Sequence, residues 1–205
     1  MTAPYQIGWF LSANTLESLF GLECRGCHHL PPSGPVLVAA NHRSFLDPPA
    51  VGTCARRPLH YFARESLFRG IGKIILPRVN ALPVNNKGPG DLAAIRKALQ
   101  ALRGGAALLV FPEGTRSPTE DFLPARRGIG LLACRAEVPV VPVRLFGTHK
   151  ALGKHQSRPR LRTPITVIFG PPLAPSEYDP GPSAESDRYQ LAADRILGAI
   201  QEISR

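Results

Sequence analysis

The sequence lacks a long hydrophobic run and contains few aromatic residues. No stretch reaches the roughly 18 uninterrupted apolar residues that a membrane-spanning helix needs. The best candidate, Tyr5 to Leu22, is broken by Gln6, Asn14 and Glu17. Aromatic side chains make up 7% of the chain and leave little for nucleic acid bases to stack on. A basic nucleic-acid-binding module therefore remains only as the non-enzymatic alternative.

Export signals and several catalytic signatures are also absent. Residues 1–5 carry no basic n-region of a secretory leader, which predicts a cytosolic chain with free thiols at Cys24, Cys27, Cys54 and Cys134. The G-x-S-x-G signature of serine hydrolases is missing. Residues 24–28 match C-x-x-C-H, the pattern for covalent haem, but such attachment requires an exported chain. A zinc site there is disfavoured because the side chains of adjacent histidines, here His28 and His29, usually point apart in a chain, so we expect no metal.

The residues that are present predict one folded domain with a basic surface. A chain of 205 residues with 43% hydrophobic side chains suffices for a single α/β domain, residues 1–205. Residues 1–170 carry 22 basic and 9 acidic groups, whereas residues 171–205 carry 3 and 6. This balance favours anionic partners, such as a phospholipid surface or a phosphorylated substrate.

Short apolar runs alternate with helical patterns, which predicts an α/β fold with a mostly parallel, twisted sheet flanked by helices. The expected strands are Val36–Ala40, Leu59–Ala63, Val79–Val84, Ala106–Pro112, Val138–Leu145 and Pro164–Phe169. The expected helices are an amino-terminal helix within residues 1–24, Ser66–Leu76, Asp91–Leu102, Gly128–Ala136 and, after a proline-rich connector that opens residues 171–205, Ser186–Ser204. We expect Ser66–Leu76 and Gly128–Ala136 to be buried, and the first helix to lie on the core or in a membrane interface.

The first polar motif, Asn41-His42-Arg43-Ser44-Phe45-Leu46-Asp47, directly follows an expected strand. Open α/β sheets place ligands at the carboxyl ends of their strands. A regular helix would set His42 and Asp47 roughly 140° apart, but a strand-to-helix turn brings them together. Asp47 would then hold one imidazole nitrogen and leave the other free as a general base. The alternative is that Asp47 only caps a helix that has Pro48 at its first position.

The second motif, Phe111-Pro112-Glu113-Gly114-Thr115-Arg116-Ser117, follows another apolar run. Gly114 permits close approach of the backbone to a ligand, and Thr115 and Arg116 supply donors suited to a phosphate. The alternative is a surface turn with an incidental ion pair.

Together the two motifs resemble the signature blocks of the glycerolipid acyltransferases, the 1-acylglycerol-3-phosphate acyltransferase family, which read N-H-x4-D and F-P-E-G-T-R-S. Three further segments are similar to this family in the same order: Cys24–Pro35, Phe62–Phe68 and Val138–Val143. The resemblance covers residues 20–150.

The resemblance implies an O-acyltransferase of phospholipid biosynthesis, attached peripherally at the cytoplasmic face of an anionic membrane. It implies that His42, oriented by Asp47, takes a proton from the hydroxyl of a lysophospholipid such as 1-acyl-sn-glycerol-3-phosphate. The alkoxide then attacks the thioester of acyl-CoA or acyl carrier protein. The residues that the resemblance assigns to the acceptor are Glu113, Gly114, Thr115 and Arg116, with Arg116 at the phosphate. It implies no metal, no organic cofactor beyond the acyl donor, and no nucleic acid partner.

One block of the family is not matched. That block ends G-x-(I/L)-x-(V/I)-x-R, and its final Arg contacts the acceptor phosphate, whereas this chain has Asn80 and Asn86 at the Gly and Arg positions. Lys87 or Arg78 would have to supply the charge, and Lys lacks the bidentate fork of Arg. A lyso-lipid with another head group, such as a lyso-ornithine lipid, is the alternative acceptor. We expect Lys87→Ala to raise the KM for the acceptor.

Overall fold

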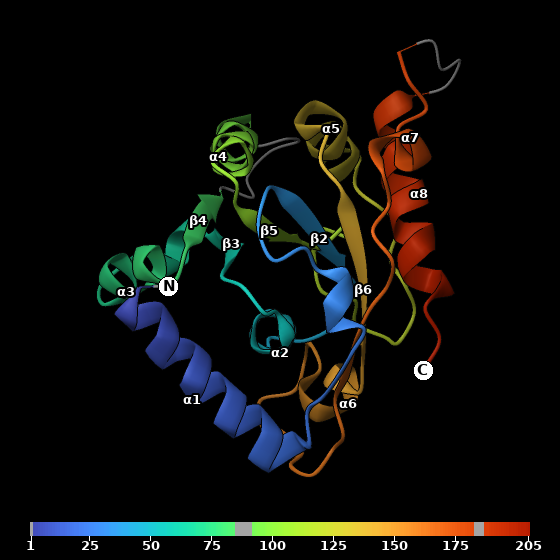
Figure 1. Cartoon of the computed structure of the whole chain (residues 1–205). Coiled ribbons are helices and arrows are strands. Elements are labelled where there is room, and N and C mark those ends of the chain that lie inside the picture. Colours follow the sequence, from blue (N-terminus) through green and yellow to red (C-terminus); the bar gives the residue numbers. More distant parts are fainter. Residues whose placement is uncertain (1, 85–91, 183–186) are drawn as a thin grey trace.

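The computed structural model describes residues 2–84, 92–182 and 187–205. A seven-stranded sheet in the order β1-β7-β6-β2-β5-β3-β4 forms its centre (Figure 1). The strands are β1 (Glu23–Arg25), β2 (Val36–Ala40), β3 (Leu59–Arg64), β4 (Ala81–Val84), β5 (Ala107–Val110), β6 (Val140–Phe146) and β7 (Thr166–Phe169). All neighbouring strands pair in parallel except β6 and β7, which are antiparallel.

Helices cover both faces of the sheet. The α-helices are α1 (Ala3–Phe20), α2 (Asp47–Cys54), α3 (Gly72–Arg78), α4 (Leu92–Arg103), α5 (Arg127–Ala136), α6 (Thr148–Leu152), α7 (Pro175–Tyr178) and α8 (Arg188–Glu202), and the 3-10 helices are η1 (Cys27–His29) and η2 (Glu65–Leu67). Helices α1, α2 and α6 lie on one side of the sheet, and α4, α5 and α8 on the other (Figure 1). None of the helices in the described ranges is both long and apolar enough to cross a membrane.

The central strand β2 supplies both hydrophobic cores. Its five residues are all buried, as expected for a strand covered on both faces. Val36 and Val38 pack with α1 and α2 in one core, whereas Leu37 and Ala39 pack with α4, α5 and α8 in the other. This division follows from the alternation of side chains along a strand. The predicted α/β class with a mostly parallel sheet and helices at both ends is confirmed.

Two segments differ from the expected elements. The short edge strand β1 was not predicted, and its three residues are all exposed, so they carry no apolar alternation to reveal it. The prediction of a single buried helix over Ser66–Leu76 is wrong. The chain instead forms η2 and then α3, and Ile71, Ile74 and Ile75 are exposed. The apolar run resembles a core segment in sequence because hydrophobicity alone does not distinguish a buried face from an exposed one.

The expectation of four free thiols is also wrong for two of them. Cys24 on β1 and Cys54 at the end of α2 form a disulfide, with their Cα atoms 5.6 Å apart. Cys27 and Cys134 are free. In the sequence Cys24 and Cys27 are the closest pair of cysteines, but the fold places Cys54 of α2 beside Cys24 of the edge strand β1. Because Cys24 is bonded to Cys54, it is not available for the haem-type attachment that residues 24–28 suggest.

Candidate active site

The two polar motifs lie side by side because the strands that precede them are neighbours. Strands β2 and β5 pair in parallel with Ala39 opposite Val110, so both motifs leave the carboxyl edge of the sheet at the same level. The Ser117 amide donates to the His42 carbonyl oxygen at 2.8 Å. The fold therefore joins residues that are 75 positions apart in the chain.

The first motif forms a hydrogen-bonded pair of His42 and Asp47. His42 Nδ1 lies 2.8 Å from Asp47 Oδ2. An ionised carboxylate only accepts hydrogen bonds, so in the neutral ring Nδ1 carries the proton and Nε2 is free to accept one. The ring also stacks on Phe111, with centroids 3.9 Å apart and planes inclined by 15°. The imidazole is thus held in one tautomer and one orientation.

Asp47 is placed by the turn that precedes α2, not by helix capping. Its Oδ2 also accepts the amide protons of Arg43 at 2.6 Å and Ser44 at 2.7 Å, and its side chain is fully buried. Both amides lie before the helix, and the residue at the cap position, Leu46, makes no capping side-chain bond. The capping alternative therefore does not account for the carboxylate.

Glu113 connects the two motifs instead of facing a ligand. Its Oε1 accepts the His42 amide proton at 2.8 Å, and its Oε2 accepts that of Leu123 at 3.0 Å. Burial raises the pKa of this carboxyl, while the two amides and the nearby Arg43 partly oppose the shift. With both oxygens occupied by backbone, Glu113 positions His42, and we revise its expected role as an acceptor ligand accordingly.

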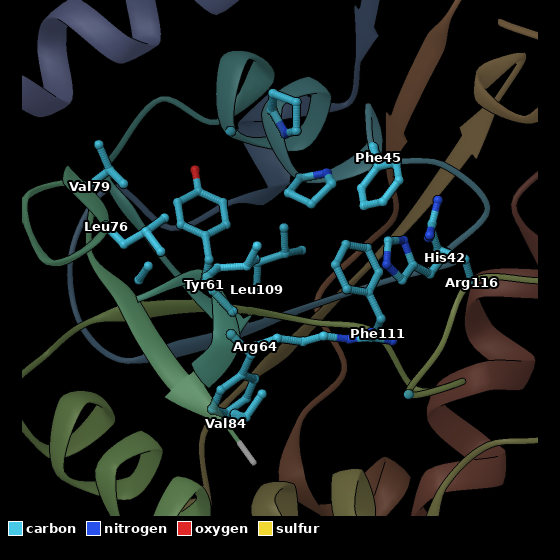
Figure 2. A pocket seen from close by; sticks show the side chains of 18 of the residues that line it. His42, Phe45, Tyr61, Arg64, Leu76, Val79, Val84, Leu109, Phe111 and Arg116 are labelled. Carbon is cyan, nitrogen blue, oxygen red and sulfur yellow. The ribbon is translucent and has the colours of Figure 1, made fainter. Parts of the chain in front are cut away.

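A cavity of about 810 Å³ opens beside His42 and extends under α1 and α3. In Figure 2, His42, Phe45, Phe111 and Arg116 lie at one end and Tyr61, Leu76 and Val79 at the other. From α1 the lining includes Tyr5, Gly8 and Trp9, and from the second motif Gly114, Thr115 and Arg116. The cavity is polar beside the imidazole and mainly apolar farther away, which suits a ligand with a charged head and a hydrocarbon chain.

Three arginines line this cavity, Arg64, Arg116 and Arg126, and the first two lie close enough for their charges to interact. The Arg116 guanidinium lies over the Phe45 ring, 3.5 Å from its centroid, and its buried Nη1 has no hydrogen-bond partner among the described residues. Arg64, at the end of β3, lines the same cavity, and its side chain extends toward Phe111 (Figure 2). Burial lowers the pKa of Arg116, the positive charge of Arg64 lowers it further, and Asp47 opposes both. Two close guanidiniums form a site for an anion.

The unmatched family block has a partial structural explanation. Asn80 has φ of 61°, a left-handed conformation that glycine adopts freely and asparagine tolerates better than other residues. Asn80 therefore keeps the backbone conformation that the family's glycine would permit. Arg78 Nη1 donates to the Ile74 carbonyl oxygen at 2.6 Å in its own helix and does not line the cavity. Asn86 and Lys87 lie outside the described residues.

Sequence reasoning did not single out Arg64. Arg64 is followed by Glu65, and this sequence is typical of two charged residues on the protein surface. Only the parallel pairing of β3 with β5 brings the end of β3 to the edge of the sheet that holds the motifs.

Ser44 is not available as a nucleophile. Its Oγ donates to the Leu152 carbonyl oxygen at 2.6 Å and accepts from the Leu46 amide. Within residues 2–84, 92–182 and 187–205, no group of three or more His, Cys, Asp or Glu side chains is arranged to hold a metal.

Comparison with known proteins agrees with this geometry. The family model named Acyltransferase matches residues 21–145. The chain is 35% identical over 198 residues to 1-acyl-sn-glycerol-3-phosphate acyltransferase alpha of Ovis aries, covering 93% of this chain and 66% of the sheep protein. It is 33% identical over 163 residues to a probable 1-acyl-sn-glycerol-3-phosphate acyltransferase of Mycoplasma genitalium, covering 72% and 60%. The chain therefore spans 66% or less of the length of these two relatives.

The fold is similar to that of a solved structure. The crystal structure of the 1-acyl-sn-glycerophosphate (LPA) acyltransferase PlsC from Thermotoga maritima superposes with a TM-score of 0.77 at 23% identity. The superposition covers 97% of this chain and 78% of that one. Nearly all of the present chain is thus accounted for by one known architecture.

Proposed function

The chain belongs to the acyltransferase family, and from this premise we propose that it transfers a fatty acyl group from an acyl thioester to the free hydroxyl of a lysophospholipid. The acceptor named by its relatives is 1-acyl-sn-glycerol-3-phosphate, which would give phosphatidic acid. The observation that carries the proposal is the hydrogen-bonded pair of His42 and Asp47 at the mouth of an apolar cavity.

The proposed reaction is a direct transfer without a covalent acyl-enzyme. His42 Nε2 accepts the proton of the acceptor hydroxyl while the oxygen attacks the thioester carbonyl carbon. The C–S bond then breaks as the new C–O ester bond is completed, and the imidazolium returns its proton to the leaving thiolate. The Asp47 carboxylate stabilises the imidazolium between these two steps. These steps call for no cofactor beyond the acyl donor, because His42 and the two substrates account for every proton and bond.

The acceptor phosphate is proposed to bind between Arg116 and Arg64. Both line the cavity, and two neighbouring guanidiniums can donate charge-assisted hydrogen bonds to one phosphate. Gly114 has φ of 65°, which allows the backbone of the second motif to approach the ligand beside Thr115. Arg64 thereby compensates for the Asn that replaces the family's arginine at position 86. This pairing favours lysophosphatidic acid over a lyso-lipid without a phosphate.

The acyl chain is proposed to enter the apolar end of the cavity, between Tyr61, Leu76 and Val79. The donor is acyl-CoA or acyl carrier protein, whose phosphates or acidic surface suit the basic chain. We propose peripheral attachment at the cytoplasmic face of an anionic membrane, since the acceptor is a membrane lipid.

The proposal is tested with purified protein in detergent micelles, labelled acyl-CoA or acyl carrier protein, and a set of lyso-lipids that differ in head group. We expect phosphatidic acid from lysophosphatidic acid, identified by mass spectrometry. Arg64→Ala and Arg116→Ala should each raise the KM for this acceptor at least tenfold, because each removes a charged hydrogen-bond partner worth about 1.5–3 kcal/mol.

A matched control is Arg135→Ala on α5, an exposed arginine away from the cavity. It should leave KM unchanged. Preferred use of a phosphate-free lyso-lipid would contradict the assigned acceptor, and absence of transfer to every lyso-lipid would contradict the proposed activity.

A further inference from the structure

Two arginines lie together at a place that the proposed reaction does not use. Arg43 follows His42 in the first motif, and Arg144 lies on β6, just beyond the level at which β2 ends. Their guanidiniums lie over the same aromatic ring, that of Phe122, at 4.9 Å and 5.2 Å from its centroid. Neither arginine lines the cavity beside His42. The two arginines therefore form a second cationic cluster at the carboxyl edge of the sheet.

This cluster is buried without a counter-charge. Arg43 is only 7% exposed, and the Nε atoms of Arg43 and Arg144 are both buried without a hydrogen-bond partner among the described residues. Within the described part of the chain, neither arginine forms an ion pair. A guanidinium cannot lose its proton in a protein. A buried one therefore needs hydrogen-bond acceptors or an opposite charge to offset the loss of water.

The neighbouring groups hold the two side chains without neutralising them. Arg144 Nη1 donates to the carbonyl oxygens of Gln201 and Ile203 at 2.6 Å and 2.8 Å, which leaves the Nε side of this guanidinium. Burial raises the pKa of the Glu113 carboxyl and the charge of Arg43 opposes that shift, but both Glu113 oxygens already accept backbone amides. Burial lowers the pKa of Arg144, and the positive charge of Arg43 lowers it further. The two guanidiniums therefore repel each other.

We propose that Arg43 and Arg144 form a binding site for a small tetrahedral oxyanion, the group that inorganic phosphate and phosphate monoesters share. The Nε–H and a neighbouring N–H of a guanidinium form the fork that matches two phosphate oxygens, and the Nε of each arginine is without a partner among the described residues. A phosphate carries up to two negative charges near neutral pH, so one ion offsets both guanidiniums. The site does not depend on the proposed acyl transfer.

The surroundings of the cluster favour a small ion and link it to the first motif. Phe122 packs against the core that contains Leu37 and Ile196, and Arg43 is almost covered, so a small ion reaches it more readily than a nucleic acid or a lipid headgroup does. The Arg43 amide donates to Asp47 Oδ2 at 2.6 Å. An anion that holds the Arg43 side chain therefore also holds the turn that positions Asp47, and it stabilises the folded chain.

The test is calorimetric titration of inorganic phosphate into the Arg64→Ala/Arg116→Ala protein, which lacks the two arginines proposed to bind phosphate in the cavity. This background protein should still bind phosphate. Adding Arg43→Lys or Arg144→Lys to it should weaken binding about tenfold or more, because Lys keeps the positive charge but lacks the fork. The thermal midpoint gives a second measurement: phosphate should raise it in the background protein and much less in either lysine variant.

The matched control is Arg195→Lys in the same background. Arg195 is an exposed arginine of α8 that donates to the Glu177 carbonyl oxygen at 3.4 Å, and its replacement should leave phosphate binding unchanged. Glycerol 3-phosphate, titrated in parallel, identifies the source of the ion: binding of phosphate alone indicates the free ion, and binding of both indicates the phosphate group of an ester. No binding to the folded background protein, or equal binding to the folded lysine variants, would overturn the proposal. A protein that binds phosphate but transfers no acyl group would contradict only the proposed function.

Discussion

At the scale of single residues, the site depends on backbone amides as much as on side chains. Asp47 Oδ2 accepts from the amides of Arg43 and Ser44 in addition to the imidazole. Glu113 holds the backbone of His42 from the other motif. These bonds leave the imidazole little freedom to turn, and a base that is already oriented loses no entropy when the acceptor arrives.

Asp47→Asn tests this positioning. The amide oxygen can still accept the three N–H groups, and its NH₂ group would take the place of Oδ1, which has no hydrogen-bond partner among the described residues. We expect kcat to fall by a factor of about 10²–10⁴, because the imidazolium loses its counter-charge. The KM for lysophosphatidic acid should change little. A variant with normal kcat would mean that the carboxylate serves folding alone.

The sequence predicts the pairing of His42 with Asp47 well, because one short turn determines it. The sequence does not predict the contacts that a residue makes with residues that follow another strand. Arg64 and the buried bonds of Glu113 are of this kind: their surroundings depend on the order of β3, β5 and β2 in the sheet. A linear sequence does not show whether a given arginine is exposed or whether a given carboxylate is buried.

At the scale of elements, α5 and α8 pack closely through a glycine. A Cβ atom added at Gly130 would lie 1.8 Å from the Tyr189 carbonyl oxygen and 2.9 Å from the Ala193 amide nitrogen. Both contacts are with backbone, which cannot rotate away as a side chain can. The close approach of α5 and α8 therefore requires glycine at this position.

Gly130→Ala should lower the free energy of unfolding by about 1–3 kcal/mol, because the two helices must move apart. Gly128→Ala, two positions earlier, is the matched control. An added Cβ there meets nothing within 4 Å, and the change should be neutral or stabilise by about 0.5–1 kcal/mol. Chemical denaturation measures both values. Equal effects of the two substitutions would contradict the packing described.

The disulfide is a second constraint between elements. It joins β1 to α2 across 30 residues, and closing a loop of that length stabilises by about 2–4 kcal/mol. We expect two of the four thiols to react in the unfolded, unreduced chain. Cys24→Ser/Cys54→Ser should lower the free energy of unfolding by that amount, and a reductant should destabilise the unchanged protein but not this variant. Four reactive thiols would show that the bond is absent.

The elements themselves were largely predictable. Strands such as β2 are short, apolar and bounded by glycine, proline or polar residues, and α4 and α8 have clear helical periodicity. Helix α3 differs from the prediction because its isoleucines satisfy the pattern of a buried helix although they are exposed. The failure has a physical cause, because an exposed apolar helix face and a buried one can have the same composition.

At the scale of the whole molecule, an ion pair fixes the acidic carboxyl-terminal segment, residues 171–205, by joining the end of α7 to the start of α8. Arg188 of α8 binds Asp179 through two nitrogens, Nε at 2.7 Å and Nη2 at 2.5 Å. The Arg188 guanidinium holds the pKa of Asp179 at about 2, below its ordinary value of 3.8. Because the folded-state pKa is the lower one, this pair stabilises the fold above pH 3.8 and loses that effect as the pH falls toward 2.

Asp179→Asn should therefore lower the thermal midpoint at pH 7, and the difference from the unchanged protein should disappear between pH 4 and pH 2. Glu120→Gln is the control, because the Glu120–Lys150 pair is more than half exposed and such pairs contribute little. A constant difference across this pH range would contradict the assignment. Thermal unfolding followed by circular dichroism measures both.

The proposed activity depends on His42 acting as the base that activates the acceptor. The most direct measurement is the rate of transfer from labelled acyl-CoA to lysophosphatidic acid in micelles, for His42→Ala beside the exposed control His155→Ala. The role of His42 as the base predicts a loss of about 10²–10⁴-fold for the first variant at an unchanged thermal midpoint and none for the second. Near-normal transfer by a folded His42→Ala protein would contradict it.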